Sequence, residues 1–277
     1  MKYLVSTRVL ETIERECWRY PNTETGGILV GFRDHDQVTI TDATGPGPNS
    51  ERSAQHFVKD TDYLQSVLNL LFEYFQVNYL GVWHKHPDSM PYPSDGDVVA
   101  IMKEVGDPKM DLEELITPIC VMSAGKVNIV PYRIKDHLIT PLTWDPVPHQ
   151  QLPAQRSRAD HWYATPVGQR RLTSELAEFE AMGVAVELRK GKDGSYRFYV
   201  PVADGSPLRL VMLCHDDYPV SAPEVAVYDL ESKKSEPVSS PKLSDWNIHQ
   251  HLVDIFREYQ GISVTAASLR QDSSPSG

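Results

Sequence analysis

A proline-rich stretch interrupts the apolar patterning of this 277-residue chain between residues 141 and 157. Its sequence, PLTWDPVPHQQLPAQRS, follows neither the helical nor the strand period, and closely spaced prolines favour an extended linker. A chain of this length has a prior of about two domains. We therefore expect a linker over 141–157 that separates a domain over 1–140 from a domain over 158–265, with a disordered tail over 266–277.

The first half mixes helical and strand patterns, which predicts an α/β domain. Segments with apolar residues at helical spacing are 9–20, 60–76 and 94–105. Short apolar runs that predict strands are 28–32, 37–41, 79–83 and two within 115–134.

The second half predicts an α+β domain, because one helix precedes a series of strands. That helix spans 168–182, and a last helix lies around 245–259. The extended segments between them are VAVELRK, SYRFYVPV, LRLVMLC and EVAVYDL. The tail, SLRQDSSPSG, is too poor in apolar residues to form a core of its own.

Acidic residues outnumber basic ones, 38 to 27, so the net charge is −11. Nucleic acids and anionic lipid surfaces bind through basic surfaces, which this composition does not favour. No apolar run approaches the ~20 residues of a membrane span, and polar residues interrupt the start before a signal core forms. We therefore expect a cytoplasmic protein that binds neither nucleic acid nor membrane. The three cysteines are too far apart to indicate a disulfide framework or a cysteine-based zinc site.

A histidine pair, His84-Lys85-His86, follows the strand predicted over 79–83. Side chains alternate along a strand, so His84 and His86 lie on one face and Lys85 on the other. Two imidazoles that converge at a strand end can share one metal. The alternative is that both histidines are surface residues of an edge strand and that Lys85 is solvated.

Ser94 and Asp97 follow the histidine pair at the start of the next predicted helix. A serine followed three residues later by an acidic residue is by itself explained by a capping box. Together with His84 and His86, however, Asp97 completes a set of two imidazoles and one carboxylate. Such a three-ligand set leaves a fourth position for water, which is typical of a catalytic zinc site.

The compound pattern resembles the signature of the JAMM zinc metallopeptidases, also called MPN or JAB. In that family an upstream glutamate is followed by HxH, a seven-residue spacer and SxxD. The matching positions here are Glu24, His84, His86, Ser94 and Asp97, with Glu24 in the similar context TETGGILVGF. The resemblance covers about residues 1–140 and implies an MPN-type α/β zinc peptidase domain. Lys85 departs from the serine or threonine that is more common between the histidines.

The resemblance also implies a role for each matching residue. His84, His86 and Asp97 would bind Zn²⁺, which lowers the pKa of a bound water toward ~7. Glu24 would take the proton of that water and deliver it to the leaving amine. Ser94 would donate a hydrogen bond to the tetrahedral oxyanion. Without the other residues of the motif, Glu24 would be interpreted as an exposed carboxylate in a turn.

A second HxH, from His249 to His251, serves as a comparison. It falls within the helix predicted around 245–259, where side chains at i and i+2 point about 200° apart. Such a pair cannot share a metal, so we assign it no function.

Residues 168–262 resemble the ubiquitin-conjugating-enzyme fold or its non-catalytic RWD relatives. The resemblance rests on RRLTSELAEF, on the series of strands, and on HDDYPVSAPEVAVYD, which is similar to that superfamily's Tyr-Pro-x-x-x-Pro turn. Active conjugating enzymes carry a nucleophilic cysteine after this turn, whereas here the last cysteine, Cys214, precedes it. We therefore predict a ubiquitin-conjugating-like or RWD-like α+β domain over 158–265 that binds and does not form a thioester.

The leading hypothesis is a zinc metallopeptidase, a JAMM-type isopeptidase similar to deubiquitinases. It would remove a ubiquitin-like modifier from conjugates or process the modifier's precursor. The residues themselves indicate only metal-assisted amide hydrolysis, and the resemblance supplies the substrate class. Expected partners are a ubiquitin-like protein or its conjugate and enzymes of the conjugation pathway, in a pairing of domains similar to bacterial ubiquitin-like pathways. The alternatives are a zinc hydrolase of small peptides or carrier-protein adducts, and a non-catalytic two-domain scaffold.

Overall fold

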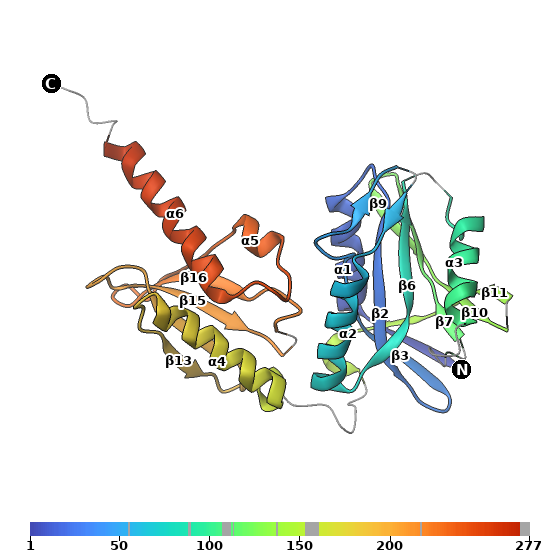
Figure 1. Cartoon of the computed structure of the whole chain (residues 1–277), viewed down its shortest axis with the longest axis horizontal. Helices are drawn as coiled ribbons and strands as arrows, with labels where there is room; N and C mark the ends of the chain where they lie inside the picture. The colour runs from blue at the N-terminus through green and yellow to red at the C-terminus, as the bar shows by residue number, and fades with distance from the viewer. Residues whose placement is uncertain are drawn as a thin grey trace. The chain divides into compact units, whose positions relative to one another are not determined.

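The computed structural model describes residues 1–54, 56–87, 90–106, 112, 114–136, 138–152, 161–216 and 218–271, with side chains described as far as residue 261. The chain divides into two compact units, Met1–Arg158 and Ala159–Gly277 (Figure 1). Across the described residues, no helix is both long enough and apolar enough to cross a membrane.

The first unit is a mixed α/β structure, as its alternating patterns predict. Its helices are α1 (Thr7–Arg19), α2 (Thr61–Phe75), α3 (Asp95–Val105) and the short 3₁₀ helix η1 (His149–Gln151). Its strands are β1 (Lys2–Ser6), β2 (Thr25–Arg33), β3 (Gln37–Ala43), β4 (Glu51–Arg52), β5 (Phe57–Val58), β6 (Asn78–His86), β7 (Glu114–Ile116), β8 (Ile119–Ser123), β9 (Lys126–Val130), β10 (Tyr132–Lys135), β11 (Leu138–Pro141) and β12 (Asp145–Val147).

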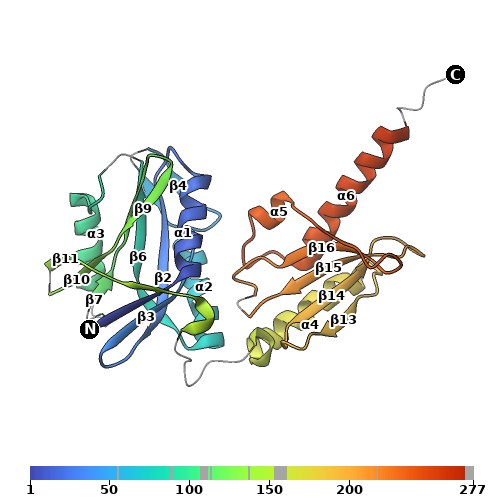
Figure 2. The ribbon, with the colours of Figure 1, turned by 180° about the vertical axis from the view of Figure 1, so that it is seen from behind.

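One ten-stranded sheet organises this unit, in the order β11-β10-β7-β6-β2-β3-β1-β12, with β8 paired to β6 and β9 paired to β8. Strand β6 is interior, because it pairs with β2 on one side and with β7 and then β8 on the other. Figures 1 and 2 show the sheet between α1 and α3. A residue on β6 therefore points toward one helical layer or the other, and an edge-strand interpretation of the histidine pair is excluded.

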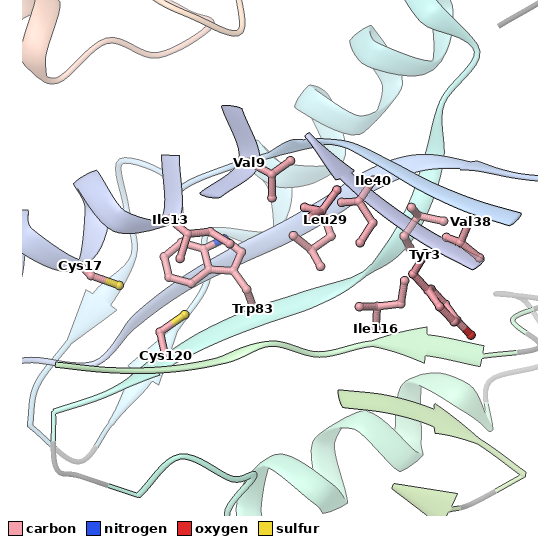
Figure 3. Packing of buried hydrophobic residues seen from close by; sticks show 12 residues of the cluster. Tyr3, Val9, Ile13, Cys17, Leu29, Val38, Ile40, Trp83, Ile116 and Cys120 are labelled. Carbon is pink, nitrogen blue, oxygen red and sulfur yellow. The ribbon is translucent and has the colours of Figure 1, made fainter. Parts of the chain in front are cut away.

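The main core lies between α1 and the sheet. Val9, Ile13 and Cys17 of α1 occupy successive turns, as their i, i+4 spacing predicts, and all are fully buried. They form one cluster with residues of the sheet that include Leu29 and Trp83 (Figure 3). This packing shows that the odd-numbered residues near the end of β6 face α1.

The segment predicted to be a linker begins with ordered structure. Asp145 to Val147 form β12, which pairs with β1 in parallel at the edge of the sheet. Leu142 and Trp144 pack against the main core. Proline is tolerated on an edge strand, because a missing N–H need not interrupt the ladder there, so the prolines alone do not indicate an extended segment. The remainder of the predicted linker, 153–157, lies outside the described residues.

The second unit consists of helices packed beside one antiparallel sheet, in the predicted order of helix, strands and helix. Its helices are the 3₁₀ helix η2 (Trp162–Ala164), α4 (Pro166–Ala181), α5 (Pro241–Ser244) and α6 (Leu252–Gln271). Its strands pair in sequence order: β13 (Glu187–Lys190), β14 (Tyr196–Pro201), β15 (Leu208–Cys214), β16 (Glu224–Asp229) and β17 (Ser235–Pro237). The order agrees with the α+β prediction, and the assignment to a ubiquitin-conjugating-like or RWD-like family stays a prediction.

The C-terminal helix differs from its prediction. α6 begins at Leu252, so the segment from His249 to His251 precedes the helix and the predicted helical geometry does not apply to it. The helix continues to Gln271, within the segment predicted as a disordered tail. Ala, Leu and Arg favour a helix without any tertiary contact. The tail is predicted to be disordered because it is poor in apolar residues, and apolar content does not measure this helix propensity. Residues 272–277 lie outside the described chain.

Candidate metal centre

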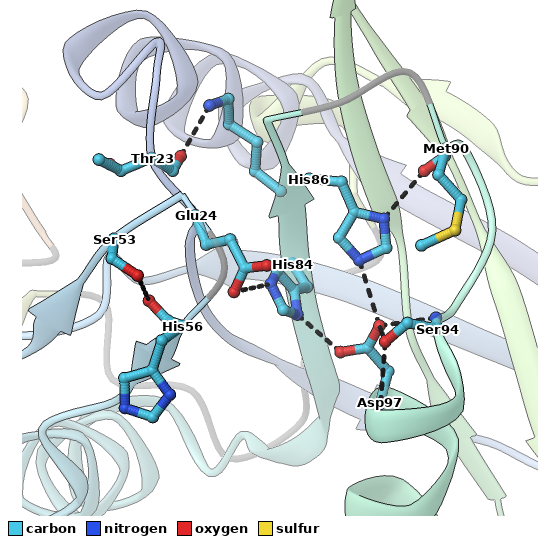
Figure 4. Close-up of polar contacts among 10 residues, drawn as sticks. Thr23, Glu24, Ser53, His56, His84, His86, Met90, Ser94 and Asp97 are labelled. Carbon is cyan, nitrogen blue, oxygen red and sulfur yellow. Dashed lines mark hydrogen bonds and ion pairs between the residues drawn. The ribbon is translucent and has the colours of Figure 1, made fainter.

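Three side chains of types that can bind a metal converge at the end of β6 from two elements. His84 and His86 come from β6, and Asp97 comes from the first turn of α3. One ligand atom from each lies within 4.8 Å of the other two (Figure 4). Within the described residues, no second group of three His, Cys, Asp or Glu side chains converges in this way. The alternation of side chains along β6 and the first turn of α3 thus bring together the three predicted ligands.

Asp97 contacts both histidines directly. Its Oδ1 lies 2.9 Å from His84 Nδ1, and its Oδ2 lies 3.1 Å from His86 Nε2. Burial alone would raise the pKa of Asp97, but hydrogen bonds with His84 and His86 hold this pKa well below the ordinary value. The carboxylate is therefore ionised at neutral pH, which is the form that binds a metal.

Neighbouring groups orient the ligands. His86 Nδ1 lies 2.9 Å from the carbonyl oxygen of Met90. Because a carbonyl can only accept, Nδ1 donates to it, and Nε2 is the nitrogen that faces Asp97. A second partner of this kind fixes the orientation of the ring, as is usual for histidines that bind metals.

Ser94 and Asp97 form the capping box that their spacing alone predicts. The Asp97 N–H donates to Ser94 Oγ at 3.2 Å, and the Ser94 N–H donates to Asp97 Oδ2 at 2.8 Å. The Ser94 hydroxyl also donates to Asp97 Oδ2 at 2.6 Å. Asp97 therefore belongs both to the helix cap and to the candidate ligand set. Because its hydroxyl proton is engaged by Asp97, the oxyanion role of Ser94 stays a prediction.

Glu24 lies beside this cluster although it is distant in sequence. It directly precedes β2, whose register places Gly26 opposite His84. Glu24 Oε2 lies 3.4 Å from His84 Nε2. The Nε2 atom is buried and has no hydrogen-bond partner. A buried ring nitrogen without a hydrogen-bond partner, close to His86 and Asp97, fits a metal centre. The Glu24 carboxylate lies beside it in the place of an adjacent base.

Lys85 is the residue that sequence reasoning misjudged. It is not solvated: it is fully buried on the α1 face of β6. Its ammonium donates to the carbonyl oxygens of Tyr20, Pro21 and Thr23 at 2.8, 2.9 and 2.9 Å. Alternation predicted the face correctly, but a single strand pattern carries no information about what covers that face.

The second HxH is part of a different set of contacts. The His251 ring lies 3.5 Å from the buried carboxylate of Glu175, and the His251 N–H donates to Asp254 at 2.9 Å at the start of α6. His249 contributes a backbone N–H to Asn247. These residues precede α6, so the helical geometry from which the sequence excluded a shared metal does not apply to them.

Comparison with known families identifies the first unit. Residues 6–135 match the family described as prokaryotic homologs of the JAB domain. The N-terminal unit contains a JAB-type domain. The matched residues include Glu24, the HxH pair and the Ser94 to Asp97 cap. The predicted resemblance to the JAB domain is therefore confirmed for this part of the chain.

Three curated relatives share the name CD-NTase/cGAS isopeptidase. The protein of Escherichia coli strain TW11681 is 35% identical over 81 residues, which is 28% of this chain and 52% of the relative. That of Enterobacter hormaechei subsp. hoffmannii is 31% identical over 96 residues, which is 34% of this chain and 53% of the relative. That of Vibrio cholerae serotype O1 is 33% identical over 76 residues, which is 27% of this chain and 49% of the relative. The chain thus spans about half the length of the curated relatives it matches.

Proposed function

We propose that this protein is a zinc-dependent isopeptidase that removes a ubiquitin-like modifier from conjugates or processes its precursor. The observation that carries the proposal is the convergence of His84, His86 and Asp97 beside Glu24 in a JAB-type domain. Two imidazoles, one carboxylate and an adjacent carboxylate base are the groups that metal-assisted amide hydrolysis requires.

Zinc fits the donor set better than a hard cation. Imidazole nitrogens suit zinc, whereas magnesium and calcium prefer oxygen ligands alone. His84, His86 and Asp97 would hold the ion. When bound, zinc polarises the scissile carbonyl and lowers the pKa of a bound water.

The side chains around the ligands have separate tasks. Glu24 accepts the proton of the attacking water and delivers it to the leaving amine, from a position 3.4 Å from His84. Asp97 keeps both histidines in place, and the Met90 carbonyl keeps the His86 ring in the orientation whose Nε2 faces the ligand cluster. Ser94 holds the Asp97 carboxylate through its hydroxyl. Its oxyanion role requires this hydroxyl to turn from Asp97 to the substrate.

The substrate class rests on the relatives and on the predicted second domain. The shared name of the three relatives supports an isopeptide bond as the target. We propose that the second unit, as a ubiquitin-conjugating-like or RWD-like domain, recognises the modifier, its conjugate or a conjugation-pathway enzyme. The only cysteine described in that unit, Cys214, is buried, and burial raises the pKa of its thiol well above the ordinary value. This supports binding over thioester transfer. We further propose a cytoplasmic location without nucleic-acid or membrane partners.

The decisive test compares a base variant with a ligand variant. Glu24→Gln should reduce turnover of a ubiquitin-like fusion by at least about 100-fold, since general-base catalysis contributes roughly 10²–10⁴-fold. It should still bind one zinc per chain, measured by metal analysis after gel filtration. His84→Ala should lose both turnover and zinc, and Glu51→Gln, on the exposed β4 residue, should change neither.

The same assay separates the proposal from its alternatives. Chelator-sensitive cleavage of short peptides with no cleavage of fusions would favour the small-peptide hydrolase. A zinc-binding protein that cleaves neither substrate class would favour the scaffold. Unchanged turnover in Glu24→Gln would contradict the assigned base.

A further inference from the structure

The buried lysine between the two histidines connects the candidate metal centre to a different part of the chain. Lys85 faces α1, while His84 and His86 face α3 on the other side of β6. Its three carbonyl partners all belong to the connection between α1 and β2. That connection ends at Glu24, the proposed base.

The contacts of Lys85 explain how a charged ammonium can be buried in the core. An ammonium has three N–H donors, and each has a carbonyl partner here. Tyr20 is the C-cap of α1, so the ammonium lies at the negative end of the helix dipole. Without these partners, the buried charge would be strongly destabilising. A serine or threonine side chain at this position could not extend to the three carbonyls.

The contacts converge on one peptide unit. The carbonyl of Thr23 accepts from Lys85 at 2.9 Å, and the N–H of Glu24 donates to the carbonyl of Ser53 at 2.8 Å. These two groups belong to the same planar peptide bond. Holding both ends of that plane fixes the position of the Glu24 Cα. On the other side of Glu24, Thr25 is paired with Lys85 in the β2–β6 register. Holding the chain on both sides of Glu24 restricts the direction in which its Cα–Cβ bond leaves the backbone.

We propose that Lys85 is a positioning residue for Glu24, which ties the base-bearing connection to the strand that carries the metal ligands. The inference rests on the proposed function of Glu24 as the base. A single β6 triplet then does two things: His84 and His86 supply ligands on one face, and Lys85 sets the place of the base from the other face. The other interpretation is that Lys85 only stabilises the core and has no bearing on Glu24.

The test uses the full chain with Lys85→Met, which keeps the length of the side chain and removes its donors. Lys126→Met, at an exposed position on β9, is the matched control. Backbone hydrogen exchange, measured residue by residue without substrate, should be at least about tenfold faster at the Glu24 amide in Lys85→Met and unchanged along α2. Lys85→Arg, which retains donors, should restore part of the protection. Zinc stoichiometry should remain one per chain.

Kinetics then separate a positioning role from a general loss of stability. In Lys85→Met we expect kcat to fall about 10- to 100-fold with KM within about threefold, because a misplaced catalytic group costs on that order. In a Glu24→Gln background the same substitution should cause no further loss. Losses that multiply, or unchanged protection of the Glu24 amide, would overturn the proposal.

Two remaining outcomes also decide the question. If Lys85→Met and Lys85→Arg both fail to fold, Lys85 is a core requirement and the positioning role is rejected. If the wild-type protein cleaves no substrate, the proposed function fails, whereas the exchange data still decide whether Lys85 holds the Glu24 peptide unit.

Discussion

At the scale of single residues, Asp97 contacts most of the other side chains of the candidate metal centre. Its two carboxylate oxygens contact His84, His86 and Ser94, and its own N–H is capped by the Ser94 hydroxyl. The same serine therefore contributes to helix stability and to the orientation of a proposed ligand. These two contributions can be measured separately.

We expect Ser94→Ala to destabilise the chain by about 1 kcal/mol, the usual cost of losing a serine N-cap. Zinc affinity should fall about tenfold, because the substitution removes a partner that orients a ligating carboxylate. Denaturant unfolding measures the first effect, and competition with a chromophoric chelator measures the second. Ser66→Ala on α2, where the hydroxyl donates only to the Asp62 carbonyl, is the control. A loss of stability with unchanged zinc affinity would limit Ser94 to a cap.

At the scale of elements, a buried carboxylate connects α4 to the start of α6. Glu175 is fully buried and contacts Arg171 and His251 at 2.6 and 3.5 Å. It also accepts from the Tyr218 hydroxyl and from the Leu252 N–H. Burial alone would raise the pKa of Glu175, but hydrogen bonds from these partners and the Arg171 charge hold it below the ordinary value.

This lowered pKa predicts acid sensitivity of the second unit. A carboxyl whose pKa is lower in the folded state contributes stability above its unfolded pKa of about 4.3, and that contribution is lost as the pH falls through the folded value. We therefore expect the free energy of unfolding to decrease below about pH 4.3. Glu175→Gln should remove this part of the pH dependence.

Glu175→Gln should also cost about 3 kcal/mol at pH 7, because it leaves the Arg171 charge buried without a carboxylate. Unfolding of both proteins between pH 3 and pH 7, followed by a fluorescence signal from Trp162 or Trp246 in single-tryptophan variants, provides the measurement. Glu180→Gln, on the same helix and exposed, is the control. Parallel pH profiles for wild type and Glu175→Gln would show that Glu175 does not cause the acid sensitivity.

At the scale of the whole molecule, the two units are expected to respond differently to metal. All three proposed ligands belong to the unit Met1–Arg158. A ligand that binds only the folded state stabilises that state by about 2.7 kcal/mol at 100 times its Kd.

Hydrogen exchange of the full chain with and without zinc tests this difference. Protection should increase in β6 and at the start of α3, and should stay the same in β14 and β15. An equal increase in both units would indicate that the metal stabilises the second unit as well, which the proposed centre does not explain.

Much of the candidate site follows from local rules that a sequence displays. Strand alternation places His84 and His86 on one face, and the serine cap places Asp97 in the first turn of α3. The α/β character of the first unit and the helix-strand-helix order of the second follow from apolar periodicity in the same way. These properties depend on neighbours a few residues apart along the chain.

Only the tertiary structure decided the features that join distant segments. The burial of Lys85, the 3.4 Å approach of Glu24 to His84, and the pairing of β12 with β1 depend on which elements pack together. The same is true of Gly27, where a Cβ would lie 2.0 Å from the Thr44 carbonyl oxygen. A local pattern states which face a side chain takes, but not what covers that face. The sequence by itself therefore determined the ligand types and their spacing, and the packing of α1, β2 and β6 determined how a base reaches them.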